Sequence, residues 1–154
     1  MSDCIFCNIA AGTAPSFKIR ENDDFLAFLD GFPNTKGQTL VIPKKHYESD
    51  FFLVDDPKFY QDYLVAAKEV VEILKKGLGV HRVAMVMEGM GVDHLHLKLY
   101  PLHGLDKERK QTLSNDPKFF ETYGGYISSQ MGPKADFEEQ GALQTQIING
   151  AALK

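Results

Sequence analysis

The residues whose types and spacing best suit chemistry are His94, His96 and Lys98, which alternate with leucines in the stretch "DHLHLKLYP". In a β-strand, alternate side chains point to the same face, and each two-residue step covers roughly 6.5–7 Å. The leucines are then expected to face a core, while both imidazoles and the ammonium share the opposite face. Such a face suits a negatively charged ligand, although alternation by itself fits a half-exposed strand with a polar outer face equally well.

The composition indicates a globular protein of one ordinary domain. The chain has 154 residues, of which 44% are apolar and 25% are charged, and its formal net charge is −4. The negative charge disfavours non-specific binding to nucleic acids or anionic membranes, so neither is expected as a partner. The first residues carry no basic leader, and no apolar run approaches the ~18 residues of a membrane span. We therefore expect a cytoplasmic protein.

The two cysteines of the chain, Cys4 and Cys7, form a Cys-x-x-Cys motif. In a reducing compartment this spacing favours a metal pair or a redox pair over a structural disulfide. Two unlinked cysteines in a packed turn are a further alternative. The redox alternative is weakened because no βαβ pattern follows the motif.

The elements that must position these residues are predicted to be strands around one long helix. The helix is predicted from about Pro57 to Lys76, with Asp56 as its cap and Gly77 at its end. Its apolar residues recur with i, i+3, i+4 spacing, so one stripe is expected to face a core. Strands are predicted at 17–22, 25–30, 38–46, 82–88 and 94–100. The order predicts an α+β fold: an antiparallel meander of five to six strands with one long packed helix.

The chain changes character after position 104, where it becomes more polar and contains two Gly/Pro breaks. A short helix is expected at about 136–149, with these apolar residues on its inner side: Phe137, Leu143, Ile147 and Ile148. About 50 residues are too few for a separate core. We therefore expect a domain at 1–104 and a C-terminal extension at 105–154 packed on the same domain.

These motifs resemble the histidine triad (HIT) superfamily of nucleotide hydrolases and transferases, whose signature is His-φ-His-φ-His-φ-φ with φ apolar. Here it reads "HLHLKLY", preceded by a β-meander and by "GQTLVIPKKH". The opening stretch "CIFCNIAAGTAPSFKIRENDDFLAFLD" resembles the Cys-x-x-Cys branch of bacteria and archaea. The resemblance covers roughly residues 3–104. Two departures stand out: Lys98 replaces the third histidine, and the preceding turn reads "EGMGVD" where many relatives carry Ser, Thr or Gln.

The resemblance implies a catalytic role for the triad. In the family the middle histidine, here His96, attacks the α-phosphate and forms a nucleotidyl-histidine that water releases. The backbone carbonyl of the first histidine, here His94, holds the other ring nitrogen and fixes the tautomer. Lys98 keeps a positive charge near the phosphate, but its usual pKa near 10.4 makes it a poor proton shuttle at neutral pH. We expect retained phosphate binding with a changed rate or leaving-group preference.

The resemblance also implies a structural zinc ion. Cys4, Cys7, His46 and His94 supply four nitrogen and sulfur ligands, the set of a closed tetrahedral zinc site. A closed site leaves no open position for activating water, so the metal is expected to orient His94 and thereby His96.

The nucleotide-binding residues are likewise expected from the family match. Asp30 matches the acidic residue that accepts the ribose hydroxyls, and Asn34 matches a position that contacts substrate. Phe28 and Ile42, together with Phe6 and Leu29, are candidates to line the base. The other candidates are the backbone amides of Gly89 and Gly91, as partial substitutes for the polar phosphate contacts.

The leading hypothesis is a hydrolase that cleaves α-phosphate bonds of dinucleoside polyphosphates or nucleoside phosphoramidates through a nucleotidyl intermediate at His96. A purine nucleotide is the expected substrate, and a homodimer is expected because the family commonly forms one. The alternatives are a non-catalytic nucleotide sensor with a degenerate triad, a nucleotidyltransferase, and a zinc-stabilised scaffold whose extension binds a protein partner.

Overall fold

The computed structural model describes residues 3–105, 107, 115–129 and 132–152. It divides into two compact units, Met1–Lys110 and Gln111–Lys154, which are described separately below. The expected boundary at 104/105, and the packing of the extension on the first domain, remain predictions. Among the described residues no helix combines the length and the apolar content needed to cross a membrane.

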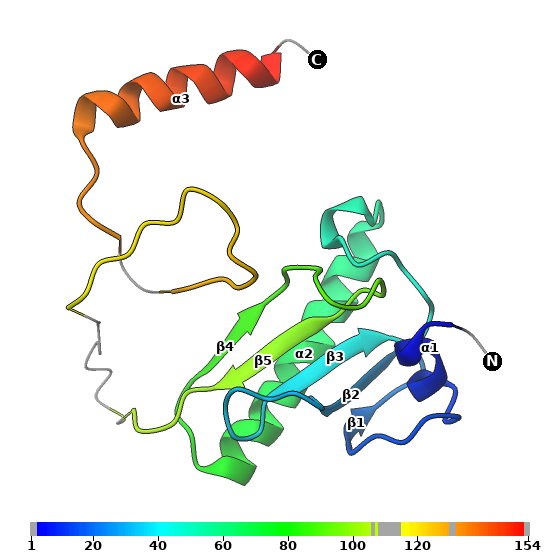
Figure 1. Ribbon diagram of the computed structural model, residues 1–154. Helices are drawn as coiled ribbons and strands as arrows, with labels where there is room; N and C mark the ends of the chain where they lie inside the picture. Colours follow the sequence, from blue (N-terminus) through cyan, green and yellow to red (C-terminus); the bar gives the residue numbers. More distant parts are fainter. Residues whose placement is uncertain (1–2, 106, 108–114, 130–131, 153–154) are drawn as a thin grey trace. The chain divides into compact units, whose positions relative to one another are not determined.

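The first unit is built on a five-stranded sheet whose neighbouring strands are all antiparallel. The strands are β1 (Lys18–Glu21), β2 (Phe25–Leu29), β3 (Thr39–Pro43), β4 (Val83–Val86) and β5 (Leu97–Pro101). Their order in the sheet is β1-β2-β3-β5-β4, which places β5 between β3 and β4 (Figure 1). The predicted α+β fold with an antiparallel meander is confirmed, with five strands.

The long helix α2 (Pro57–Leu78) follows a short 3₁₀ turn, η1 (Phe51–Leu53). The Asp56 side chain caps α2 by accepting a hydrogen bond from the Lys58 amide, as the sequence predicts. The helix ends at Gly79, which has a φ of 67°, so the prediction of an end at Gly77 is wrong by two residues. Gly77 stays helical because the left-handed residue that stops a helix is the later glycine.

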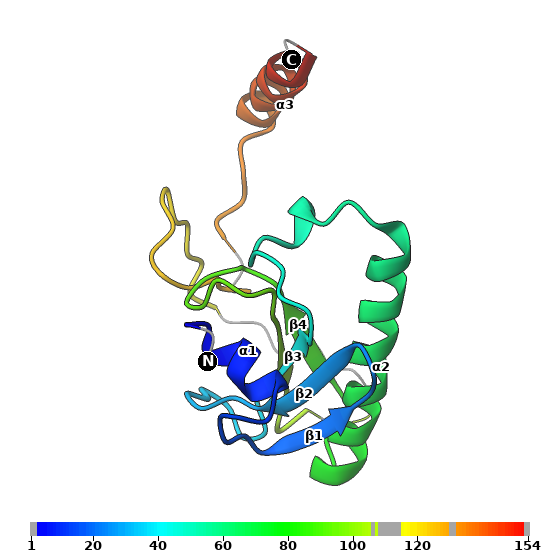
Figure 2. The same ribbon diagram turned by 90° about the vertical axis from the view of Figure 1, so that its right-hand side faces the viewer.

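The two faces of the sheet carry different clusters of buried residues. The face under α2 holds the larger cluster, which includes Ala27, Val41, Tyr63 and the leucines of the triad segment. The opposite face holds a smaller cluster that Phe6 and Ile9 of α1 (Ile5–Ala10) complete. Figure 2 shows α1 and α2 on opposite sides of the strands. This division follows from strand alternation, which sends neighbouring residues to opposite faces.

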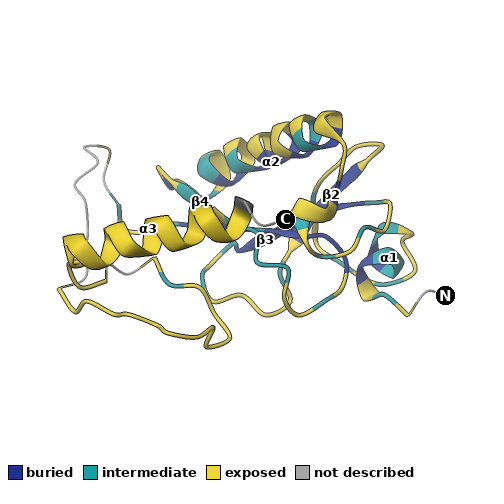
Figure 3. Cartoon of the chain, turned by 90° about the horizontal axis from the view of Figure 1, so that it is seen from above, coloured by how far each residue is buried: buried dark blue, intermediate teal, exposed yellow. Residues whose placement is uncertain are grey.

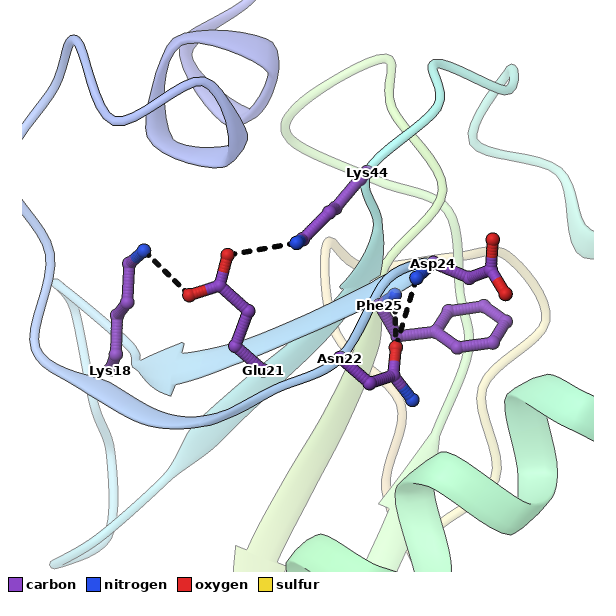
Figure 4. Close-up of polar contacts among 6 residues, drawn as sticks. All are labelled: Lys18, Glu21, Asn22, Asp24, Phe25 and Lys44. Carbon is purple, nitrogen blue, oxygen red and sulfur yellow. Dashed lines mark hydrogen bonds and ion pairs between the residues drawn. The ribbon is translucent and has the colours of Figure 1, made fainter.

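The turn between β1 and β2 is closed by the side chain of Asn22, which accepts hydrogen bonds from the Asp24 amide (3.0 Å) and the Phe25 amide (2.7 Å). Beside it, the Glu21 carboxylate lies between two lysines at 2.8 and 2.9 Å (Figure 4). Hydrogen bonds from Lys18 and then Lys44 lower the pKa of Glu21 to about 2. This turn separates the first two predicted strands, at 17–22 and 25–30.

The second unit contains one helix, α3 (Phe137–Ala152), within its described residues. The Asp136 carboxylate accepts hydrogen bonds from the Glu138 and Glu139 amides at 2.9 and 3.0 Å, which explains why the helix starts here. Within its own unit, α3 exposes the apolar side chains that the sequence analysis expects on an inner side (Figure 3), so their packing remains a prediction. The exposed fractions of its apolar side chains are 92% for Phe137, 44% for Leu143, 61% for Ile147 and 59% for Ile148.

Candidate functional site

The triad segment enters β5 from an irregular stretch that neighbouring loops hold in place. The strand begins at Leu97, so His94 and His96 precede it, whereas the sequence predicts strand from position 94. The Leu95 amide donates to the Tyr47 carbonyl at 2.9 Å, which fixes this stretch beside the loop after β3. The predicted alternation is nevertheless present: the leucines at 95, 97 and 99 are 0% exposed in the core under α2.

His96 is buried at 3% exposure on the α1 side of the sheet, and its ring meets the edge of Phe6 at 5.5 Å between ring centroids. Its Nδ1 lies 2.8 Å from the backbone carbonyl of His94, the contact that the family resemblance implies. A carbonyl oxygen only accepts hydrogen bonds, so Nδ1 carries the proton. In the neutral imidazole, Nε2 then holds a lone pair that can attack an electrophile.

Cys4, Cys7, His46 and His94 come together from α1, the loop after β3 and the triad segment, with their ligand atoms all within 4.8 Å of one another. His94 Nδ1 lies 3.4 Å from Cys4 Sγ and 3.5 Å from Cys7 Sγ. His46 Nδ1 lies 3.4 Å from Cys7 Sγ. The structure therefore gathers the four residues that the sequence analysis predicts as metal ligands.

These residues fit a zinc ion in both chemistry and orientation. His94 Nε2 lies 2.8 Å from the Pro43 carbonyl and must donate to it, which leaves the Nδ1 lone pair directed at the thiols. Burial lowers the pKa of His94, which favours the neutral form that binds metals. Two thiolates and two imidazoles are a common tetrahedral zinc set. The cluster is therefore compatible with a structural metal site in which His94 is both a ligand and the hydrogen-bond acceptor for His96.

Lys98, at the third triad position, forms an ion pair with Glu88, which follows β4. Burial alone would lower the pKa of Lys98, but the hydrogen bond and charge of Glu88 raise it above its usual value. Sequence reasoning missed Glu88. The usable signal was the antiparallel register, because Val86 pairs with Lys98 and Glu88 lies two residues further along the same face.

Asp30 and Asn34 are joined through Gln38, a buried residue that the sequence analysis did not single out. Gln38 Nε2 donates to Asp30 Oδ2 at 2.6 Å, and Gln38 Oε1 accepts from the Asn34 amide at 2.9 Å. Asp30 Oδ1 accepts from the Phe32 amide at 2.9 Å. Each carboxylate oxygen has a second lone pair for a ribose hydroxyl, so the carboxylate is oriented without being saturated.

Phe28 and Ile42 lie in the buried cluster on the α1 face, with exposures of 4% and 0%. Phe28 and Phe6 pack edge to face at 5.8 Å between ring centroids, so the residues expected to line a base share one buried apolar cluster. Leu29 is a different case. It follows Phe28 in the strand and points away from this cluster, so it cannot line the same base.

The turn after β4 contains two glycines in the left-handed region, Gly89 (φ 71°) and Gly91 (φ 98°). A Cβ at Gly89 would approach the Ser49 carbonyl to 2.9 Å, so a side chain is excluded there by contact as well as by conformation. His103 lies just past the triad strand, is exposed, and donates a hydrogen bond from Nε2 to the Lys36 carbonyl at 2.8 Å. His81, which follows α2, is also exposed.

Comparison with known proteins places this geometry in context. The sequence pattern of the HIT domain family matches residues 11–104 of this chain. An uncharacterized HIT-like protein of Methanocaldococcus jannaschii is 39% identical over 110 residues, which cover 68% of this chain and 83% of the relative. A structure titled as a HIT family hydrolase from Legionella pneumophila is 30% identical, with a TM-score of 0.54, over 64% of this chain and 91% of its own.

A second solved structure is titled as a zinc-bound histidine triad family protein from Mycobacterium smegmatis. It is 25% identical, with a TM-score of 0.62, and the match covers 99% of this chain and 98% of that one. The likeness thus extends through both units of the chain.

Proposed function

The chain belongs to the HIT domain family, and on that premise we propose that it hydrolyses the α-phosphate bond of a purine nucleotide derivative through a covalent intermediate on His96. The substrate classes are dinucleoside polyphosphates and nucleoside phosphoramidates. The observation that carries the proposal is the 2.8 Å contact between His96 Nδ1 and the His94 carbonyl, which leaves Nε2 as the nucleophile.

In the first step, the Nε2 lone pair of His96 attacks the α-phosphorus in line with the leaving group. The new N–P bond forms as the bond from phosphorus to the leaving atom breaks, and that electron pair departs with the leaving group. The His94 carbonyl accepts from Nδ1–H throughout and stabilises the positive charge that develops on the ring. The product of this step is a nucleotidyl-histidine.

In the second step, water attacks the same phosphorus and the N–P bond returns its electron pair to Nε2. The water oxygen stays on the nucleoside monophosphate, and one water proton balances the charge of the departed group. Asp30, held by Gln38, is proposed to accept the ribose hydroxyls, with the base against Phe28 and Ile42. Asn34 and the amides of Gly89 and Gly91 are proposed as further substrate contacts.

Zinc, when bound by Cys4, Cys7, His46 and His94, would supply rigidity: it fixes the His94 ring and the backbone that follows it. The His94 carbonyl belongs to the same residue as one ligand. A well-ordered ligand therefore keeps the acceptor for His96 Nδ1 in place. The proposed role of the metal is structural.

A homodimer is part of the proposal, as is usual in the family. Tyr63 of the predicted stripe is 0% exposed and belongs to the intramolecular core. Leu64, Val65 and Ile73 of α2 are 42%, 58% and 40% exposed, so they leave apolar surface for a second copy. Sedimentation of the full chain tests this point, with a dimer mass as the expected result.

The direct test of activity is turnover of diadenosine polyphosphates, adenosine phosphoramidate and ADP by the wild type and by His96→Asn. The proposal expects AMP release by the wild type and loss of about 10³-fold or more in the variant, because the nucleophile is gone. Nucleotide binding without AMP release by the wild type would refute the hydrolase. The nucleotide-sensor alternative would then replace it.

A further inference from the structure

The ion pair between Lys98 and Glu88 differs from the others in its burial. The Lys98 side chain is 19% exposed and the Glu88 side chain 11%. Every other ion pair within the described ranges exposes at least 30% of each side chain. Removing both charges from water is costly, and such pairs are weak stabilisers compared with apolar residues of similar size. The location of this pair next to the proposed nucleophile points to a functional role.

The order of the strands indicates which part of a substrate would lie at this ion pair. The residues proposed to bind the nucleoside come from β2 and from the segment leading into β3, on one side of β5. Glu88 follows β4, on the other side of β5. A substrate with its nucleoside over β2 and β3 and its α-phosphate at His96 therefore extends its remaining part towards β4. The leaving group is that remaining part.

The charge near the leaving group is set by the pair as a whole. A free Lys98 ammonium would attract a polyphosphate, but Glu88 neutralises it, and the raised pKa of Lys98 keeps the pair ionic at neutral pH. Tyr100, the next residue on this face, adds no charge, because burial raises its pKa. The negative charge of the Asp30 carboxylate also contributes to raising the pKa of Lys98. Summed over these described residues, the charge is therefore zero or negative.

We propose that Glu88 is a specificity-determining residue: by neutralising Lys98, it disfavours substrates whose leaving group is a polyphosphate and favours leaving groups of little or no negative charge. The inference rests on the proposed hydrolysis at His96. A polyphosphate departs with the electron pair of the broken P–O bond and needs no proton. An amine departs from a P–N bond after its nitrogen takes a proton from solvent, and the attacking water returns one proton to solvent in the second step.

The test compares two substrates with the same adenosine 5′-phosphoryl group: adenosine 5′-phosphoramidate, which releases ammonia, and diadenosine tetraphosphate, which releases ATP. Glu88→Gln keeps the size and a hydrogen-bonding oxygen but leaves Lys98 unneutralised. The ratio of kcat/KM values is expected to shift at least about tenfold towards diadenosine tetraphosphate, and to shift less at high salt. A ratio that stays within about twofold of wild type would overturn the role of Glu88.

Glu72→Gln is the matched control, since it removes the same charge from an exposed pair with Lys75 on α2 (3.6 Å). It should leave the ratio unchanged. The double variant Glu88→Gln/Lys98→Gln is again neutral and should restore a ratio near that of wild type. A merely structural pair would instead lower turnover of both substrates together.

Two further results keep the inference falsifiable. If Glu88→Gln does not fold, Lys98→Gln alone provides the test, because it leaves the carboxylate unneutralised and should shift the ratio towards the phosphoramidate. A shift in the other direction would overturn the role of Glu88. If wild type turns over neither substrate, the proposed function itself is refuted. If wild type turns over both substrates and Glu88→Gln leaves the ratio of kcat/KM values unchanged, only the proposed role of Glu88 is refuted.

Discussion

The two faces of the sheet share the same five strands but differ in what covers them. The α2 face is a continuous apolar core that includes Tyr63, Leu97 and Leu99, all 0% exposed. The α1 face pairs a smaller apolar cluster with three buried polar residues, Gln38, His94 and His96. Thr39 is also buried, but it points to the α2 side by alternation.

This difference indicates that one face supplies stability and the other supplies chemistry. A short helix such as α1 (Ile5–Ala10) covers little area. The α1 face therefore depends on a polar framework: the Cys/His cluster, the hydrogen bond from His96 to the His94 carbonyl, and the ion pair at Lys98. Perturbing each face separately should affect stability and activity to different degrees.

Metal removal should have the largest effect, and mainly on the α1 face. Zinc present at about 1,000 times its Kd stabilises the folded chain by about 4 kcal/mol through mass action, and a chelator should remove that amount. Thermal unfolding with and without chelator measures it. Cys4→Ser/Cys7→Ser is the control, because it should show no response to zinc. Equal stability of wild type with and without zinc would contradict the metal site.

Leu99→Ala should cost about 3 kcal/mol of unfolding free energy, since it opens a cavity in the α2 core. The kcat/KM of the remaining folded protein should stay near wild type, because Leu99 points away from the site. Urea denaturation measures the loss of unfolding free energy, and steady-state kinetics measures kcat/KM.

Leu40→Ala is the matched variant on the other face, where Leu40 pairs with Lys98 across the strands. It should cost less stability, about 2 kcal/mol, because its cluster is smaller. Its kcat/KM should fall. If Leu99→Ala reduced kcat/KM as much as Leu40→Ala, the division between the faces would be wrong.

The smallest effect is expected for Tyr63→Phe. The Tyr63 hydroxyl donates to the Val41 carbonyl at 2.6 Å, and losing this buried bond should cost about 1 kcal/mol. Burial raises the pKa of Tyr63, so the folded state holds its proton more tightly than the unfolded state. Stability from this group is therefore present below pH ~10 and lost as pH rises further. Urea denaturation at pH 8 and 11 should show a smaller alkaline loss in the variant than in wild type.

The sequence was sufficient for features that depend on short-range patterns. Strand alternation placed the leucines at 95, 97 and 99 in the core, and the family motif identified the four residues of the Cys/His cluster. Asp56 was recognisable as a cap because capping is a local hydrogen bond. The end of α2 was predicted two residues early, because Gly77 and Gly79 are equally plausible stop residues until one adopts a positive φ.

Features that depend on pairing between distant segments were not predictable in this way. Glu88 reaches Lys98 only because β4 and β5 are antiparallel in one particular register. Gln38 links Asp30 to Asn34 through side-chain geometry that no periodicity encodes. The amphipathic pattern of α3 likewise predicts an apolar face but does not say what covers it.

The central claim is that His96 Nε2 becomes covalently bonded to the α-phosphorus. Its most direct test is mass spectrometry of the full chain quenched in the first turnover with adenosine 5′-phosphoramidate or diadenosine tetraphosphate. The account predicts one added adenylyl group, located on the peptide that contains His96 and missing in His96→Asn. AMP release by the wild type with no such adduct under any quench, and persistence of that release in His96→Asn, would contradict it.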